Sequence, residues 1–375
     1  MAFNKKFLAI VLACVMALSL VACGTTASTP AASGSTPATG STATGDKPYI
    51  AIVSKGFQHQ FWQVVKVGAE QAAIDYDVEI TFDGPPSETD VAVQVDMLKS
   101  AIDKKPDAIA LAALDTQSVM ELLNQCVEQG IPVIGFDSGV PNAPEGAIFA
   151  TASTDNAAAA GIAAEHLYAN EDFKAALDAA TGASPVYVGV LSQDATSESV
   201  VNRTAGFIDK LVELVGEENV EVKGHDKYNK AASGEAKLVI NVNVPPTTAA
   251  DAMKTGAETL LGAGNLSAIY GSNENAAGGI LAASNDGQEF AEGGKYNGII
   301  AIGFDAGKTQ RTAVENGWFY GSITQDPFQI GYKAVELSVQ AIKGETAASE
   351  IVDTGAKWYD SSNLNDADIT DLVYE

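Results

Sequence analysis

Short apolar, β-rich runs alternate with amphipathic segments of helical period along most of the chain, from Pro48 to Glu375. The first half predicts strands at 49–54, 78–82, 108–112, 132–136 and 149–151. The second half predicts strands at 186–191, 220–223, 268–271, 299–303 and 320–324, with helices near 197–215, 249–262, 275–284, 309–316 and 327–343. This alternation is typical of parallel, doubly wound α/β sheets, and the region is long enough for two domains.

Polar side chains follow five of these predicted strands. They are Asp115-Thr116, Asp137-Ser138, Asn273-Glu274, Asp305 and Gln325-Asp326. Ligands of open α/β sheets lie outside the carboxyl ends of the strands, and carboxylates and amides offer two bonding positions to adjacent hydroxyls. Capping of the next helix explains each residue alone equally well. Five at equivalent strand ends favour a shared ligand cleft.

An aromatic segment, Lys55 to Trp62, follows the first predicted strand. A sugar ring presents C–H patches on one side and hydroxyls around its edge, so aromatic faces beside polar groups suit it. Core packing explains Phe61 or Trp62 equally well, and His59 could equally be a satisfied residue on a surface helix. The segment is therefore a candidate first wall of a sugar pocket.

The N-terminal segment has the features of a bacterial lipoprotein signal. Lys5 and Lys6 precede an apolar run, and Leu20-Val21-Ala22-Cys23-Gly24 resembles a lipobox. The resemblance implies removal of residues 1–22 as a signal peptide and a diacylglycerol on Cys23. The apolar run is short for a membrane span of about 20 residues. We expect a protein anchored by lipid to the outer face of a bacterial cell membrane, of Gram-positive type.

Residues 24–45 contain only Gly, Thr, Ala, Ser and Pro. None of these side chains buries enough surface to offset the entropy of ordering the chain. Residues 23–46 are therefore predicted to form the lipidated Cys23 and a disordered tether that holds the folded part away from the membrane.

Charge and motif content exclude other classes. The formal net charge of −26 argues against a nucleic-acid partner. Cys126 stands alone in an apolar helical pattern and is predicted to be a small core residue rather than part of a disulfide. The sequence lacks a G-x-S-x-G, an H-E-x-x-H and a Walker loop, and its three histidines, His59, His166 and His225, are far apart. We predict no enzyme activity, metal site or cofactor.

Several motifs in a fixed order resemble one known family over nearly all of the folded length. They are Ser54–Trp62, Gly130–Ser138, Thr154-Asp155-Asn156 before Gly161, Asn202–Phe207, Tyr270–Glu274, Ile302–Asp305 and Thr324–Pro327. The pattern resembles the ribose- and galactose-type sugar-binding proteins of ABC importers, which have the type I periplasmic binding protein fold. The resemblance implies two doubly wound parallel-sheet lobes joined by a three-segment hinge, with crossovers near Thr154, Gln325 and Asp353. The N-terminal lobe would be 47–154 plus 327–352, and the C-terminal lobe 155–326 plus 353–375.

The same resemblance assigns residue roles. The implied ligand-binding residues are His59, Phe61, Trp62, Asp137 and Ser138 in the first lobe, and Arg203, Asn273, Asp305 and Gln325 in the second. Asp155 and Asn156 fall where the chain first crosses between lobes, so they are assigned to the hinge. The implied partners are a sugar or polyol, a permease and its ATPase subunit, with the binding protein itself a monomer.

Departures from the family pattern leave the ligand open. Ribose-type proteins commonly carry Asp-Arg where this chain has Asp137-Ser138, and Asn with small neighbours where it has Gln58-His59-Gln60. The lost guanidinium removes one bidentate clamp. Another pentose or hexose, a cyclic polyol such as inositol, and the furanosyl signal autoinducer-2 all fit. An alternative role is that of a sensor whose closed form is presented to a receptor, which the sequence does not distinguish from import.

Overall fold

The computed structural model describes residues 47–57 and 59–374. The predicted signal peptide, the lipidation site Cys23 and the tether lie outside the described residues. In the described part, no helix is both long and apolar enough to cross a membrane.

Six parallel strands form the first sheet, in the order β12-β5-β4-β3-β1-β2. Their bounds are β1 Tyr49–Val53, β2 Glu79–Asp83, β3 Ala108–Leu111, β4 Val133–Phe136, β5 Ile148–Ser153 and β12 Ile351–Asp353. β3 and β4 are buried along their whole length. Such continuous apolar runs are expected for parallel strands that are covered on both faces.

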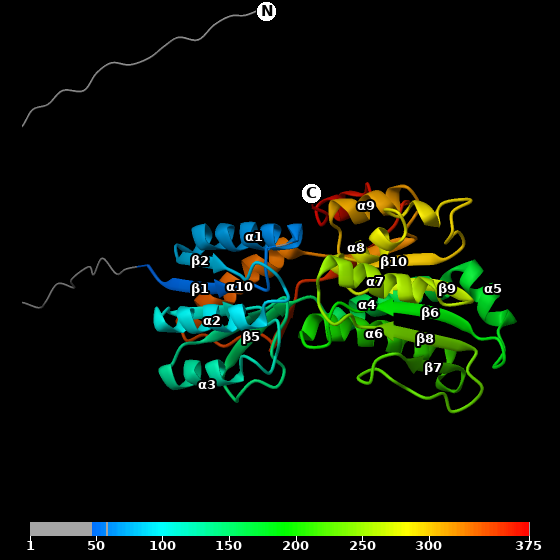
Figure 1. Ribbon diagram of the computed structural model, residues 1–375. Helices are drawn as coiled ribbons and strands as arrows, with labels where there is room; N and C mark the ends of the chain where they lie inside the picture. The colour runs from blue at the N-terminus through cyan, green and yellow to red at the C-terminus, as the bar shows by residue number, and fades with distance from the viewer. Residues whose placement is uncertain (1–46, 58, 375) are drawn as a thin grey trace, which may run out of the picture. The chain divides into compact units, whose positions relative to one another are not determined.

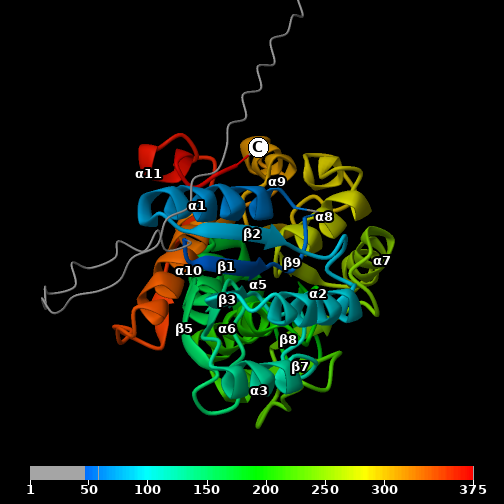
Figure 2. The same cartoon turned by 90° about the vertical axis from the view of Figure 1, so that its left-hand side faces the viewer.

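Helices cover both faces of this sheet. α1 (Gln60–Tyr76) and α10 (Pro327–Ile342) share a core with one set of alternating strand residues, and α2 (Val91–Asp103) and α3 (Met120–Gln129) share a core with the other set (Figure 2). α1 and α10 approach closely, because a Cβ at Gly331 would lie 1.8 Å from the Val65 carbonyl oxygen. This sheet and its four helices are called the first lobe.

The second sheet has seven strands in the order β13-β11-β10-β9-β6-β8-β7, of which only β13 is antiparallel to its neighbour. Their bounds are β6 Val186–Leu191, β7 Val220–Lys223, β8 Leu238–Asn243, β9 Leu266–Gly271, β10 Ile300–Phe304, β11 Gly321–Gln325 and β13 Ala356–Tyr359. α4 (Asn156–Ala169), α5 (Glu171–Ala179) and α6 (Glu198–Val215) cover one face, and α7 (Ala250–Leu261), α8 (Glu274–Ala283) and α9 (Lys308–Glu315) the other (Figure 1). This sheet and its helices, with the short α11 (Ala367–Thr370), are called the second lobe.

The chain passes between the two sheets three times, after β5, after β11 and after β12. Two of these crossings are tied together, because the Asp353 carboxylate accepts hydrogen bonds from the Asp155 N–H (3.0 Å) and the Gly355 N–H (2.9 Å). β12 includes Asp353, so the sheet extends one residue past the predicted lobe boundary at 352. The predicted fold class, two parallel-sheet α/β lobes, is confirmed, whereas β8, β12 and β13 were not predicted.

Candidate functional site

Residues from both lobes line a small cavity at the carboxyl ends of the strands. The cavity measures about 20 Å³ and is called the cleft. It is lined by Lys55, His59, Phe61, Trp62, Glu88 and Asp137 of the first lobe, and by Val200, Arg203, Asn273, Glu274, Asp305 and Gln325 of the second. A space of this size holds about one water molecule. The cavity is small because the polar side chains around it bond to one another.

The same local structure delivers one aspartate from each lobe to the cleft. β4 and β10 both end in Gly-Phe, and Asp137 and Asp305 follow them. Both have left-handed backbone, with φ of 56° and 80°, and only 3% and 5% of each residue is exposed. This conformation costs a non-glycine residue about 1 kcal/mol or more, and such strain concentrates at functional sites. The turn directs a buried carboxylate into the cleft from each sheet.

Arg203, on α6, organises the second-lobe side of the cleft. Its Nε donates to Asn156 Oδ1 (2.7 Å) and its Nη2 donates to Gln325 Oε1 (2.9 Å), while Nη1 lies 3.6 Å from Asp305 Oδ2. The guanidinium carbon lies 4.0 Å from the centre of the Phe304 ring. Such a fixed, planar fork suits oriented hydrogen bonding to ring and hydroxyl oxygens.

Lys55 is the cation of the first-lobe side. Its Nζ lies 2.9 Å from Asp137 Oδ2 and donates to Ser199 Oγ of the second lobe (3.0 Å). Burial by itself lowers the pKa of Lys55, but the carboxylates of Asp137 and Glu88 outweigh it, and the pKa is raised. Lys55 is therefore a charged donor at the floor of the cleft.

Glu88 joins the lobes on the other side of the cleft. Its carboxylate accepts hydrogen bonds from Trp62 Nε1 (2.8 Å) and from Gln193 Nε2 of the second lobe (2.9 Å). Gln193 Oε1 in turn accepts from Asn273 Nδ2 (2.8 Å). Burial raises the pKa of Glu88, but the charges of His59 and Lys55 and these hydrogen bonds lower it below its usual value.

Two other buried atoms of the cleft, His59 Nε2 and Glu274 Oε2, have no hydrogen-bond partner among the described residues. Burial raises the pKa of Glu274 to about 7, against the opposing charge of His59 and with help from the negative charges of Asp305 and Glu88. These two atoms are free to bond to a ligand that enters between the lobes.

The structure brings eight of the nine predicted ligand-binding residues to the cleft: His59, Phe61, Trp62, Asp137, Arg203, Asn273, Asp305 and Gln325. Ser138 does not line the cleft, because its Oγ accepts a hydrogen bond from the Ser199 N–H (3.4 Å) where the lobes meet. Asp155, assigned to the hinge, caps α4 through the Ala158 N–H (3.0 Å). Asn156, also assigned to the hinge, lies beneath Arg203 and holds its Nε.

Four cleft residues were not among the predicted ones: Lys55, Glu88, Val200 and Glu274. Three of them had a signal in the sequence. Lys55 belongs to the aromatic segment, Glu274 adjoins Asn273, and Val200 precedes Arg203 by three residues, which places both on one helix face. Glu88 lies in the loop after β2, and nothing local in the sequence connects it with the cleft.

Two strand-end aspartates act as caps and do not line the cleft. Asp115 Oδ1 accepts hydrogen bonds from the Gln117 and Ser118 N–H groups, and Asp326 Oδ1 accepts one from the Gln329 N–H, at 3.0, 2.7 and 2.9 Å. Asp326 is therefore the N-cap of α10, whereas Asp115 caps the turn that precedes α3. Asn273 lines the cleft and also caps α8, because its Oδ1 accepts a hydrogen bond from the Ala276 N–H (3.0 Å).

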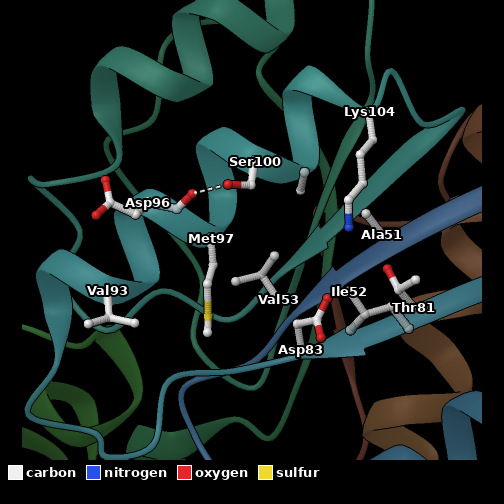
Figure 3. A pocket seen from close by; sticks show the side chains of 11 residues that line it. Ala51, Ile52, Val53, Thr81, Asp83, Val93, Asp96, Met97, Ser100 and Lys104 are labelled. Atoms are coloured by element: carbon white, nitrogen blue, oxygen red, sulfur yellow. Dashed lines mark hydrogen bonds between the residues drawn. The ribbon is translucent and has the colours of Figure 1, made fainter.

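A larger hollow lies elsewhere on the first lobe. Figure 3 shows it between α2 and the strands β1 and β2, with a volume of about 200 Å³. Val93 and Met97 of α2, and Lys104 just after it, face Thr81 and Asp83 of β2 across the hollow. No residue of the second lobe lines this hollow, and its charged residues Asp83, Asp96 and Lys104 are exposed, whereas Asp137, Arg203 and Asp305 of the cleft are buried. The cleft is therefore the better candidate site.

Comparisons with known proteins agree with this architecture. A family model described as "Periplasmic binding protein domain" matches residues 50–346. A solved structure described as "ABC transporter, LacI family transcriptional regulator" from Brachyspira murdochii is 39% identical, has a TM-score of 0.73, and covers 88% of this chain and 99% of its own.

Two further relatives are named for sugars. A solved ABC transporter solute-binding protein from Agrobacterium vitis, with bound D-fucose, is 25% identical with a TM-score of 0.70, covering 87% of this chain and 100% of that one. The D-allose-binding periplasmic protein of Escherichia coli (strain K12) is 24% identical over 307 residues, which are 78% of this chain and 84% of that protein. These relatives are binding and transport proteins rather than enzymes.

Proposed function

Because the chain belongs to the periplasmic binding protein family, we propose that it captures a monosaccharide or related polyol in the cleft and delivers it to the permease of an ABC transporter. The prediction of a sugar-binding, non-enzymatic family is confirmed by the family match and by the sugar-binding relatives. The observation that carries the proposal for this chain is the convergence of two buried aspartates, Arg203 and two amides between the lobes.

The chemistry of the cleft supports a neutral, hydroxyl-rich ligand. Asp137 and Asp305 each accept bonds from adjacent hydroxyls, while Asn273 and Gln325 both donate and accept. Phe61 and Trp62 lie at right angles to one another, with ring centres 5.0 Å apart, and give the cleft an apolar wall. A sugar ring presents both kinds of surface, so these groups match it in kind.

Opening and closing of the lobes supply the mechanism. A cavity of about 20 Å³ is too small for a sugar, so ligand entry requires the lobes to separate about the three crossings. Contacts between the lobes form on closure, including Lys55 to Ser199 at 3.0 Å and the Gly139 N–H to Glu198 Oε2 at 2.8 Å. The ligand then stabilises the closed form by its added contacts, and that form docks on the permease.

The N-terminal sequence supports an anchored version of this role. Cleavage before Cys23 and lipidation would fix a monomer to the outer face of the membrane through the tether, beside the permease and its ATPase subunit. A Cys23→Ala variant expressed in a bacterial host should leave the membrane fraction. Retention of that variant in the membrane fraction would contradict the anchor.

A thermal-shift screen of the purified protein tests the binding role. The probes are D-allose, D-ribose, D-fucose, D-arabinose, D-galactose, myo-inositol and autoinducer-2. A ligand at about 100 times its Kd adds about 2.7 kcal/mol to the free energy of unfolding, which raises Tm by several degrees.

A matched pair of variants places the binding in the cleft. Asp137→Asn should remove the Tm shift, whereas Asp115→Asn, at a strand end outside the cleft, should keep it. Absence of a shift with every probe, or an equal shift in both variants, would refute the proposed site.

A further inference from the structure

A second cavity adjoins the cleft between the lobes. It measures about 330 Å³ and is called the annex. Its lining includes Glu88, Val91 and Leu114 of the first lobe, and Gln193, Val244 and Pro245 of the second. Its volume lies in the range of about 300–1,000 Å³ that is usual for small-molecule sites.

One residue borders both cavities. Glu88 lines the cleft and the annex, and its hydrogen bond from Gln193 Nε2 (2.9 Å) forms the partition between them. Glu88 belongs to the first lobe and Gln193 to the second, so this partition exists only when the lobes are together. A ligand that is bound before closure can therefore extend through this position, with an ether oxygen accepting from Gln193 Nε2 in place of Glu88.

The walls of the annex are mostly apolar and rigid. Val91 and Leu114 line it from the first lobe, and Val244 and the consecutive Pro245 and Pro246 line it from the second. Proline fixes its own φ, and the Asn275 Nδ2 donates to the Thr248 carbonyl oxygen (2.7 Å), which fixes the end of this loop. The second-lobe wall of the annex is therefore held in one conformation.

Polar groups also border the annex. Glu88, Gln193 and Asp194 line it beside its apolar residues. The Asp194 carboxylate is already engaged, because it accepts hydrogen bonds from the Ser197 N–H (2.8 Å) and from Ser197 Oγ (2.9 Å). The directional contacts that the annex offers a ligand are therefore those of the Glu88–Gln193 partition.

We propose that the annex is a subsite for a substituent on the cleft sugar, so that the preferred ligand is a glycoside with a ring-sized, largely apolar aglycone. This inference rests on the proposed function of the cleft. The sugar ring of the glycoside occupies the cleft, the glycosidic oxygen lies at the Glu88–Gln193 partition, and the aglycone lies against Val244 and Pro245. The aliphatic walls favour an aryl or alkyl group over a second charged unit.

The test compares methyl and phenyl glycosides of D-galactose, D-glucose, D-fucose and D-allose by isothermal titration calorimetry with the purified protein. The phenyl glycoside of the sugar that binds should have a Kd about tenfold lower than its methyl glycoside, which corresponds to about 1.4 kcal/mol. Val244→Trp fills the annex without reaching the cleft, and it should abolish this preference while leaving the methyl glycoside Kd within about twofold.

Val93→Trp is the matched control, because Val93 lies on α2 outside both cavities and is already 39% exposed. It should keep the tenfold preference.

Two results overturn the inference while leaving the proposed function intact: phenyl glycosides that bind no more tightly than methyl glycosides, or a preference that survives Val244→Trp. Failure of every free sugar and glycoside to bind would overturn both.

Discussion

Replacing Glu274 with glutamine should stabilise the protein, and the gain should grow with pH. Glu274 begins α8 at the edge of the cleft, and its Oε2 has no hydrogen-bond partner among the described residues. Burial is the largest cause of its raised pKa, about 7 against 4.5 for an ordinary glutamate. The folded state therefore favours the protonated, neutral carboxyl, which the amide of glutamine imitates at every pH.

The size of the effect follows from this difference. Well below pH 4.5 the carboxyl is neutral in both the folded and the unfolded state, so it does not change the free energy of unfolding. As pH rises from 4.5 to 7, the unfolded state loses its proton first, so the folded state binds more protons and the free energy of unfolding falls. The loss approaches about 3 kcal/mol above pH 7, and it is about 1 kcal/mol at pH 5.

Urea unfolding at pH 5 and pH 8 measures this effect. Glu274→Gln should raise the free energy of unfolding by about 1 kcal/mol at pH 5 and by up to about 3 kcal/mol at pH 8. Glu315→Gln is the control, since Glu315 is exposed at the end of α9. A Glu274→Gln variant that is destabilised equally at both pH values would show that the carboxylate is ionised and well bonded, and the reasoning would be wrong.

Three further changes test other parts of the structure. Gln94→Leu removes hydrogen bonds to two strand-end carbonyls and one strand-end N–H, each 2.9 Å long and buried. Urea unfolding should show that the free energy of unfolding falls by about 3 kcal/mol, and a fall under about 1 kcal/mol would contradict the importance of these bonds. Gly331→Ala places a Cβ 1.8 Å from the Val65 carbonyl oxygen, so it should lower the free energy of unfolding in urea by several kcal/mol. Gly278→Ala is the control, because a Cβ there meets nothing within 4 Å, and it should raise the free energy of unfolding by up to about 1 kcal/mol. Arg203→Lys keeps the charge but loses the fork, so calorimetry with the sugar that binds should show at least a tenfold weaker Kd, and an unchanged Kd would exclude Arg203 from the ligand contacts.

The buried strands could be predicted from the sequence because they are continuous apolar runs between turns. The ten predicted strands agree with the observed ones to within two residues at either end. β12 and β13 have three and four residues and lie at sheet edges, so they carry little hydrophobic pattern. β8 was missed although it is largely buried, because Asn241 and Asn243 interrupt its apolar run.

The candidate site was predictable where residues are fixed by strand ends and not where they arrive through tertiary packing. Asp137 and Asp305 follow directly from the ends of β4 and β10. Glu88 reaches the cleft only because the loop after β2 folds over Trp62 and meets Gln193 of the other lobe. Ser138 shows the converse, since a residue next to a cleft aspartate points instead to the contact with Ser199.

The placement of charge in the cleft suits repeated opening around a neutral ligand. Two buried ion pairs of the described residues each lie within a single lobe, Lys55 with Asp137 in the first and Arg203 with Asp305 in the second. Separation of the lobes therefore leaves both ion pairs intact. It does not leave a buried charge without its partner, which would be costly. Closure instead forms hydrogen bonds such as Glu88 to Gln193, in which one partner is uncharged. Since both aspartates are already neutralised by their own lobe, the ligand needs to supply hydroxyls rather than charge, which is the chemistry of a sugar or polyol.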